Sequence, residues 1–301
     1  MRLNIRYLVV ITVLLVVTLN FTSSYIRHVK SGLECVERPL CYGEVGVTGE
    51  AKGFAGIAEG EYHLATMTHR TLAGVIAILV LLVNIVLIRA GESDARLRKY
   101  AVTMGGTVLW LAGLGITAGG SLGLWVVMGN LLGGMILLGS SALLMAGVFG
   151  WEQRFSLQRV VMLAGAMLLL TMFMQGGMVS AKFAGMACTT LPDCNGYWWA
   201  ENPLIQMHMM HRFSAAVAIL YFGVMLLRAL RRGDSGQRNF LLILLLLLFV
   251  QIKLGGLMVE EQLPLIVTSV HSTLSQLLIA ALLIYSSVTG VRTEKGIESG
   301  V

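Results

Sequence analysis

Long apolar stretches, each about as long as a lipid bilayer is thick, constrain this chain more than any other feature. A helix crosses the hydrocarbon core of a membrane in about 20 residues, and eight such stretches occur in the 301 residues. They lie near residues 8–26, 64–88, 100–119, 124–149, 160–180, 204–227, 239–259 and 265–288. Because 56% of the residues are hydrophobic and 13% are charged, a water-soluble domain could not bury this much apolar surface. We therefore predict an all-α integral membrane protein with eight transmembrane helices.

Basic residues are unequally divided between the loops on the two sides of these predicted helices. The richer side holds Arg2, Arg6, Arg89, Arg96, Arg98, Lys99, Arg154, Arg159, Arg228, Arg231, Arg232, Arg238, Arg292 and Lys295, and the poorer side holds Arg27, Lys30, Arg38, Lys52 and Lys182. The positive-inside rule then predicts that both termini are cytoplasmic. The net charge of +6 is explained by this orientation, and no nucleic acid partner is needed.

The first apolar stretch, near residues 8–26, has a second interpretation. Behind Arg2 and Arg6, it could be a cleaved signal peptide. No A-x-A-like cleavage site follows it, and retaining it makes the number of crossings even. We therefore expect it to be retained as a membrane helix.

Two similar cysteine-containing segments, "CVERPLC" and "CTTLPDC", place Cys35 with Cys41 and Cys188 with Cys194. Both fall in the large loops predicted on the non-cytoplasmic side, where an oxidising compartment favours one disulfide within each segment. Thiols that exchange with a redox partner remain an alternative. A zinc site made of all four thiolates is disfavoured, because C-x₅-C is not the usual ligand spacing.

The two loops are similar because the whole chain is duplicated. Residues 1–150 and 151–301 each contain a helix, a long cysteine-bearing outer loop, a helix, a short inner loop, a helix, a tight outer turn and a helix. Four crossings return the chain to its starting side, so the halves are predicted to be two four-helix bundles in a parallel repeat. The equivalent segments "MTHRTLAG" and "MMHRFSAA" align His69-Arg70 with His211-Arg212.

Three histidines lie inside apolar stretches, where polar groups are costly and usually functional. They are His69, His211 and His271, each about 10 Å below the predicted outer surface. Two imidazoles at one depth, as for His211 and His271, suit axial ligation of a heme iron. Histidines that bond to backbone or hydroxyl groups at a helix interface are the alternative. In the N-terminal half the position equivalent to His271 is Asn130, a poor iron ligand, so the two halves are not expected to be equivalent.

Other polar residues near these histidines have more than one interpretation. Arg70 and Arg212 could extend to the membrane surface or pair with a porphyrin propionate. Lys253 allows the same two roles, with surface extension favoured. His208 lies one turn above His211 on the same face and could be an alternative ligand, a proton carrier or a wall residue.

Eight helices in two halves, a cysteine pair in each large outer loop, "HR" opening the second and sixth helices and one histidine in the eighth together resemble the heme A synthase family. The resemblance covers essentially the whole chain. It implies an oxidoreductase of the cell inner (cytoplasmic) membrane that oxidises the C8 methyl group of heme o to the formyl group of heme a by successive hydroxylations. It also implies heme b as cofactor, and heme O synthase and terminal oxidase assembly as partners.

The resemblance further implies that His211 and His271 ligate heme b and that His69 ligates the substrate heme. The family has a glutamate three residues before the histidine of the second helix and a histidine in the fourth helix. This chain has Thr66 and Asn130 there, and Glu61, the possible acidic substitute, lies two turns above His69. A heme-binding paralogue or assembly factor without an active N-terminal site is therefore the alternative function. A quinone-linked cytochrome b is a further alternative, and a transporter is the least favoured class.

Overall fold

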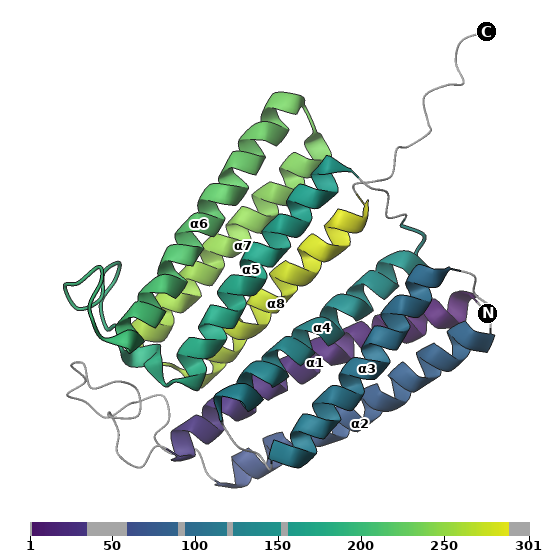
Figure 1. The fold of residues 1–301 in the computed structure, drawn as a ribbon, viewed down its shortest axis with the longest axis horizontal. Coiled ribbons are helices and arrows are strands. Elements are labelled where there is room, and N and C mark those ends of the chain that lie inside the picture. Colours follow the sequence, from purple (N-terminus) through teal and green to yellow (C-terminus); the bar gives the residue numbers. More distant parts are fainter. Residues whose placement is uncertain (1, 35–58, 90–93, 119–122, 152–155, 289–301) are drawn as a thin grey trace.

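The chain folds into long helices (Figure 1). The computed structural model describes residues 2–34, 59–89, 94–118, 123–151 and 156–288. The elements are α1 (Arg2–Glu34), α2 (Glu59–Arg89), α3 (Ala95–Ala118), α4 (Leu124–Val148), α5 (Leu157–Ala181), the 3₁₀ turn η2 (Ala184–Met186), α6 (Pro203–Arg232), α7 (Ser235–Glu260) and α8 (Leu265–Val288). Within these ranges 8 helices are long and apolar enough to cross a membrane. The predicted all-α membrane fold is confirmed.

Short polar residues and one glycine fix where the C-terminal helices begin and end. Ser156, Asn202 and Asp234 each accept a hydrogen bond from a backbone N–H in the first turn of α5, α6 and α7, respectively. Such caps satisfy N–H groups that have no partner inside the helix. Gly233 ends α6 with φ 69°, a left-handed conformation that glycine adopts at little cost. The turn between α6 and α7 is therefore specified locally by Gly233 and Asp234.

Helices α1 to α4 lie together on one side of the molecule and α5 to α8 on the other (Figure 1). Helix α8 packs against α5 and α7 of its own half, and also against α1 and α4. One hydrophobic core continues through both groups, from Val9 and Leu138 to Phe222 and Leu282. At Gly139 on α4, an added Cβ would lie 3.1 Å from a methyl group of α8, so the small residue allows close approach. The division into residues 1–150 and 151–301 remains a prediction.

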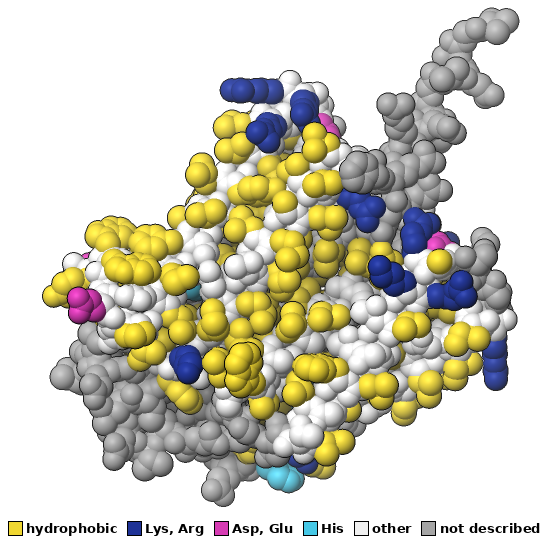
Figure 2. Space-filling model, in the orientation of Figure 1, with side chains coloured by type: hydrophobic (Ala, Val, Ile, Leu, Met, Phe, Trp, Pro, Cys, Tyr) yellow, Lys and Arg dark blue, Asp and Glu magenta, His cyan; other side chains and the backbone are white. Residues whose placement is uncertain are grey.

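Apolar side chains cover the middle of the molecule, and basic side chains gather at one end of the helices (Figure 2). Large apolar residues such as Ile116 and Trp125 are 82% and 84% exposed. In water this exposure would be unfavourable, whereas lipid is a suitable solvent for it. The loops and helix ends that join α2 to α3 and α6 to α7 carry Arg89, Arg96, Arg98, Lys99, Arg228, Arg231, Arg232 and Arg238.

Candidate functional site

A cavity of about 390 Å³ lies between the four C-terminal helices. Helices α5, α6, α7 and α8 supply most of its lining, and α1 and α4 close it from the N-terminal half. Its size lies within the range of about 300–1,000 Å³ that is usual for cofactor and ligand pockets. The wall is mostly apolar, but six nitrogen-bearing basic side chains line it. These are Arg27, His28, His208, His211, Arg212 and His271. Among the described residues that line the cavity, none is acidic.

His211 on α6 and His271 on α8 face each other across this cavity. Their ring centroids are 6.4 Å apart and the rings are inclined by 66°. The helix positions, 60 residues apart in sequence, are thus brought to one site by the packing of the C-terminal helices. Two imidazoles at this separation can share one metal ion bound between them.

The backbone of α5 sets the protonation pattern of His211. Nδ1 of His211 lies 3.2 Å from the carbonyl oxygen of Met172, and because a carbonyl can only accept, Nδ1 carries the proton. The lone pair of the neutral ring is then on Nε2, the arrangement that metal-binding histidines usually have. For His271, Nδ1 is buried and forms no hydrogen bond of ordinary geometry with a described residue.

Each of the two imidazole rings lies against a glycine. A Cβ added at Gly176 on α5 would lie 3.2 Å from Cε1 of His211, and one at Gly255 on α7 would lie 3.3 Å from Cε1 of His271. Both values are tighter than ordinary van der Waals contact. The glycines therefore leave the space in which the rings stand, and they limit where the rings can move.

Gln251 ties α7 to α8 beside His271. Its Nε2 donates to the carbonyl oxygen of His271 at 2.8 Å and to Oγ of Ser275. Gln251 is 4% exposed, so these bonds are made away from water, where an amide without partners would be costly. The contact fixes the register of the helix segment that carries His271.

The second cysteine segment forms a closed loop at the cavity, where its Leu191 and Pro192 line the wall. Cys188 and Cys194 are joined by a disulfide, as predicted. The carbonyl oxygens of Thr190 and Asp193 in this loop accept hydrogen bonds from Nη1 of Arg212 at 2.8 and 2.6 Å. Arg212 also lines the cavity, so the loop holds the guanidinium group at the cavity wall. Cys35 and Cys41 lie outside the described residues.

Opening this loop is expected to lower stability. In the double variant Cys188→Ser/Cys194→Ser, the closed ring that limits the unfolded chain is lost, at a cost of about 2 kcal/mol. For a chain of this size the melting temperature of the detergent-solubilised protein should fall by roughly 4–8 °C. A Thr189→Ser variant keeps the ring and a side-chain hydroxyl, and serves as control. An unchanged melting temperature in the double variant would show that the ring does not contribute.

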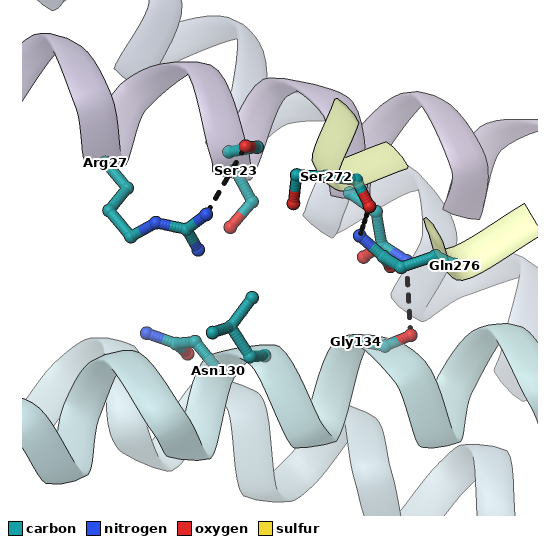
Figure 3. A pocket seen from close by; sticks show the side chains of 9 residues that line it. Ser23, Arg27, Asn130, Gly134, Ser272 and Gln276 are labelled. Atoms are coloured by element: carbon teal, nitrogen blue, oxygen red, sulfur yellow. Dashed lines mark hydrogen bonds between the residues drawn. The ribbon is translucent and has the colours of Figure 1, made fainter. Parts of the chain in front are cut away.

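The predicted residues of the N-terminal half are more dispersed. Nδ1 of His69 on α2 lies 3.3 Å from Oγ1 of Thr22 on α1. Glu61 and Arg70 are on α2, like His69, and both are exposed. Asn130 on α4 lines a separate polar cavity of about 10 Å³, in which it faces Arg27 of α1 (Figure 3). His69 is not among the residues that line that cavity, so the structure does not bring His69 and Asn130 together in it.

The structure shows where His208 and Lys253 lie, two residues for which the sequence allows several roles. His208 is 7% exposed and lines the large cavity beside His211. Its position is that of a wall residue, and its Nδ1 forms no hydrogen bond of ordinary geometry with a described residue. Lys253 is exposed on α7 and does not line the cavity, as expected for a side chain that extends toward the membrane surface.

Sequence reasoning missed the part of the cavity wall that comes from α1. Arg27 and His28 line the large cavity although they belong to the N-terminal half. The sequence places Arg27 among the basic residues of the first outer loop, because it follows the first apolar stretch, and it assigns no role to His28. A signal was present, since the helical pattern of that stretch continues without a glycine or proline to Lys30.

The fold and the cavity define a membrane protein of the eight-helix type with a histidine pair enclosed in its C-terminal half. A family model described as "Cytochrome oxidase assembly protein" matches residues 6–283. The "Heme A synthase" of Shewanella oneidensis is 28% identical over 327 aligned positions, which cover 90% of this chain and 94% of that protein. The chain therefore belongs to the heme A synthase family of cytochrome oxidase assembly proteins.

Proposed function

We propose that the chain holds heme b between His211 and His271 and oxidises the C8 methyl group of heme o to the formyl group of heme a. The observation that carries the proposal is the histidine pair, His211 and His271, in the wall of one cavity between membrane-length helices. Family membership supports the same reaction class. The net change at the methyl carbon is a four-electron oxidation: R–CH3 + 2 H2O → R–CH(OH)2 + 4 H+ + 4 e−, followed by loss of one H2O to give R–CHO. An electron acceptor outside the chain must take the four electrons.

The distance between the two rings fits a bis-histidine heme. An imidazole–metal bond of about 2.0 Å, as in zinc–histidine sites, plus ~1.1 Å from nitrogen to ring centre, would place two rings that hold one metal ion about 6.2 Å apart. His211 and His271 are 6.4 Å apart between ring centroids. Among the described residues no group of three or more His, Cys, Asp or Glu side chains could hold a metal ion. A porphyrin supplies four ligands itself, so two histidines complete its iron.

The lining of the cavity fits the rest of a porphyrin. Its wall is apolar around Phe173 and Leu248 and basic near Arg212, with no acidic residue among the described lining residues. A heme has the same division, with a flat apolar ring and two carboxylate groups on one edge. Charge-assisted hydrogen bonds between guanidinium and carboxylate are among the stronger ones in proteins. The basic side chains therefore favour binding of the propionates.

When bound, heme b supplies an iron that takes up and passes on single electrons. The residues of the chain hold and orient it. Met172 keeps the lone pair of His211 on Nε2, and Gln251 fixes the α8 segment that carries His271. In the N-terminal half, His69 is the proposed ligand of the substrate heme, and Thr22 orients its ring.

The cellular setting is part of the proposal. The gathering of basic residues at the helix ends beside the α2–α3 and α6–α7 loops supports the proposal that both termini are cytoplasmic. The protein is then a multi-pass protein of the cell inner membrane, with both cysteine loops on the oxidising side. Heme O synthase would deliver the substrate, and terminal oxidase assembly would receive the product.

A second candidate function is a heme b-binding assembly factor that does not catalyse the oxidation. Thr66 and Asn130 favour it, because they stand where the resembling family has a carboxylate and a second histidine. In addition, Asn130 and His69 do not share the polar cavity that Asn130 lines. The C-terminal heme site is the same in both candidates.

The deciding experiment is heme extraction after expression with a supply of heme o. Non-covalent hemes are extracted from the purified chain and separated by chromatography. Heme a in wild type supports the oxidoreductase, and heme b alone supports the assembly factor. In the second case, Thr66→Glu/Asn130→His tests whether restoring both side chains restores heme a.

The glycine beside His211 gives a graded test of the heme site. Gly176→Ala places a methyl group 3.2 Å from Cε1 of His211, so the ring must shift. A displaced ligand is expected to weaken heme b retention about 10-fold, the lower range for disturbing the surroundings of a metal ligand. Gly223→Ala on α6 is the matched control, because nothing lies within 4 Å of its added Cβ. Equal heme content in both variants would contradict the ring position.

A further inference from the structure

Helix α1 contributes a basic wall to a cavity that otherwise belongs to the C-terminal half. Arg27 and His28 lie near the outer end of α1, and both line the large cavity together with His211 and His271. Helix α1 is brought there by its packing along α8 and α4. The C-terminal helices alone would leave this side of the cavity open.

Two guanidinium groups therefore line one cavity, and they enter from different halves. Arg212 comes from α6, and its Nη1 is engaged by the carbonyl oxygens of Thr190 and Asp193. Its Nη2 is buried and forms no hydrogen bond with a described residue. Arg27 comes from α1, and its Nη2 donates to Oγ of Ser24 at 3.4 Å. The described residues that line the cavity include no carboxylate.

Arg27 also forms the boundary between the large cavity and the small polar one. Arg27, Leu131 and Ser272 line both cavities. The small cavity, about 10 Å³, is large enough for about one water molecule. Figure 3 shows Arg27 reaching from α1 toward Asn130 of α4, with Ser272 and Gln276 of α8 beside them. One side chain thus touches the C-terminal cavity and the polar contact zone of the N-terminal half.

We propose that Arg27 is a carboxylate-binding residue of the C-terminal cofactor site, so that the N-terminal half supplies one of two guanidinium groups and Arg212 the other. The ligand class is a flat apolar molecule with two carboxylates on one edge. The assignment rests on the proposed heme site. It makes the two halves interdependent, because the cofactor of one half is held in part by the first helix of the other.

The test compares heme with a form of heme that has lost its carboxylate charges. The full chain is produced in heme-deficient cells, placed in lipid nanodiscs and titrated with hemin and with hemin dimethyl ester. A His69→Ala background prevents binding in the N-terminal half from contributing. Wild-type Arg27 should favour hemin over the ester about 10-fold or more, the usual effect of losing a hydrogen bond to a charged group.

Arg27→Gln should weaken hemin binding about 10-fold and leave ester binding nearly unchanged, so that the preference for hemin shrinks. Arg27→Lys keeps the charge but loses the two-pronged geometry, and should give an intermediate preference. Lys253→Gln on the exposed face of α7 is the matched control and should behave as wild type.

The outcomes separate this inference from the proposed heme site. If Arg27→Gln and Arg27→Lys bind hemin with the same ratio of hemin to ester affinity as the wild type, the role of Arg27 is overturned. The proposed heme site is then unaffected. Absence of hemin binding with Arg27 present, or full binding in His271→Ala, overturns the heme site itself. If Arg27→Gln lowers the preference for hemin as expected but no heme a is ever formed, only the proposed reaction fails.

Discussion

Replacing His271 by alanine is expected to remove the heme b signal of the purified protein. The variant would remove one of the two proposed heme ligands, so the loss should exceed the 10–100-fold change in affinity that follows from disturbing a residue behind a metal ligand. Two further histidines, His28 on α1 and His208 on α6, line the same cavity. The double variants His271→Ala/His28→Ala and His271→Ala/His208→Ala therefore show whether either one replaces the lost ligand. Heme content per protein and the low-spin absorbance spectrum are the measurements.

Added imidazole and a second variant show whether His271→Ala loses heme because a ligand is missing or because the protein is misfolded. Imidazole added to His271→Ala can enter the space that the ring leaves, and should restore part of the low-spin spectrum. His271→Met offers another ligand that heme proteins use, and should retain heme with a raised reduction potential. His211→Ala should resemble His271→Ala. A full low-spin signal in either alanine variant would refute the pairing.

Replacing His69 by alanine is expected to lower the amount of heme a and to leave the amount of heme b unchanged. Heme b should stay at the wild-type level, because His69 on α2 does not line the C-terminal cavity. Heme a formation should fall about 100-fold or more, the size usual for removing a group that acts directly on the reacting molecule. Both hemes are measured by extraction and chromatography from the same preparation, with heme o supplied.

His63→Ala is the matched control for this second variant. His63 lies on α2 as well, is exposed, and is nearly two turns from His69. It should give wild-type amounts of both hemes. Heme a at wild-type level in His69→Ala would remove the N-terminal half from the reaction, and a parallel loss of heme b would show that the two sites are not separable.

The fold was predictable because membrane helices are long and have a simple composition. Length and hydropathy alone identified all eight crossings, although α1, α2 and α6 extend well beyond the apolar stretches. The opposed histidines were also predictable, since the repeat gave their helices and the distance from each helix start gave their depth. For this reason the sequence alone predicted that His211 and His271 lie near each other.

The rest of the C-terminal site depends on contacts between distant segments, which a single sequence does not encode visibly. The Met172 carbonyl that orients His211 is a backbone atom and leaves no residue signature. Gly176 and Gly255 were recognisable as small residues, but not as the places where the rings stand. Arg27 was expected in a loop because it follows the first apolar stretch, whereas it lies within α1. Nothing in the local sequence indicates that α1 packs along α8.

The N-terminal half was less predictable, because its residues depart from the pattern of the family. The equivalence of Asn130 and His271 stays a prediction. The place of Asn130 in a polar cavity shared with Arg27 follows only from the packing of α1, α4 and α8. The disulfide between Cys188 and Cys194 was predicted, whereas its contact with Arg212 was not.

A density map of the purified protein in lipid, obtained with a bound antibody fragment to aid alignment, tests the central claim most directly. A planar macrocycle should fill the cavity between α6 and α8, with its metal bridged by the rings of His211 and His271 and its carboxylate edge toward Arg27 and Arg212. Density for a porphyrin elsewhere, or two imidazole rings with only lipid or water between them, would contradict it.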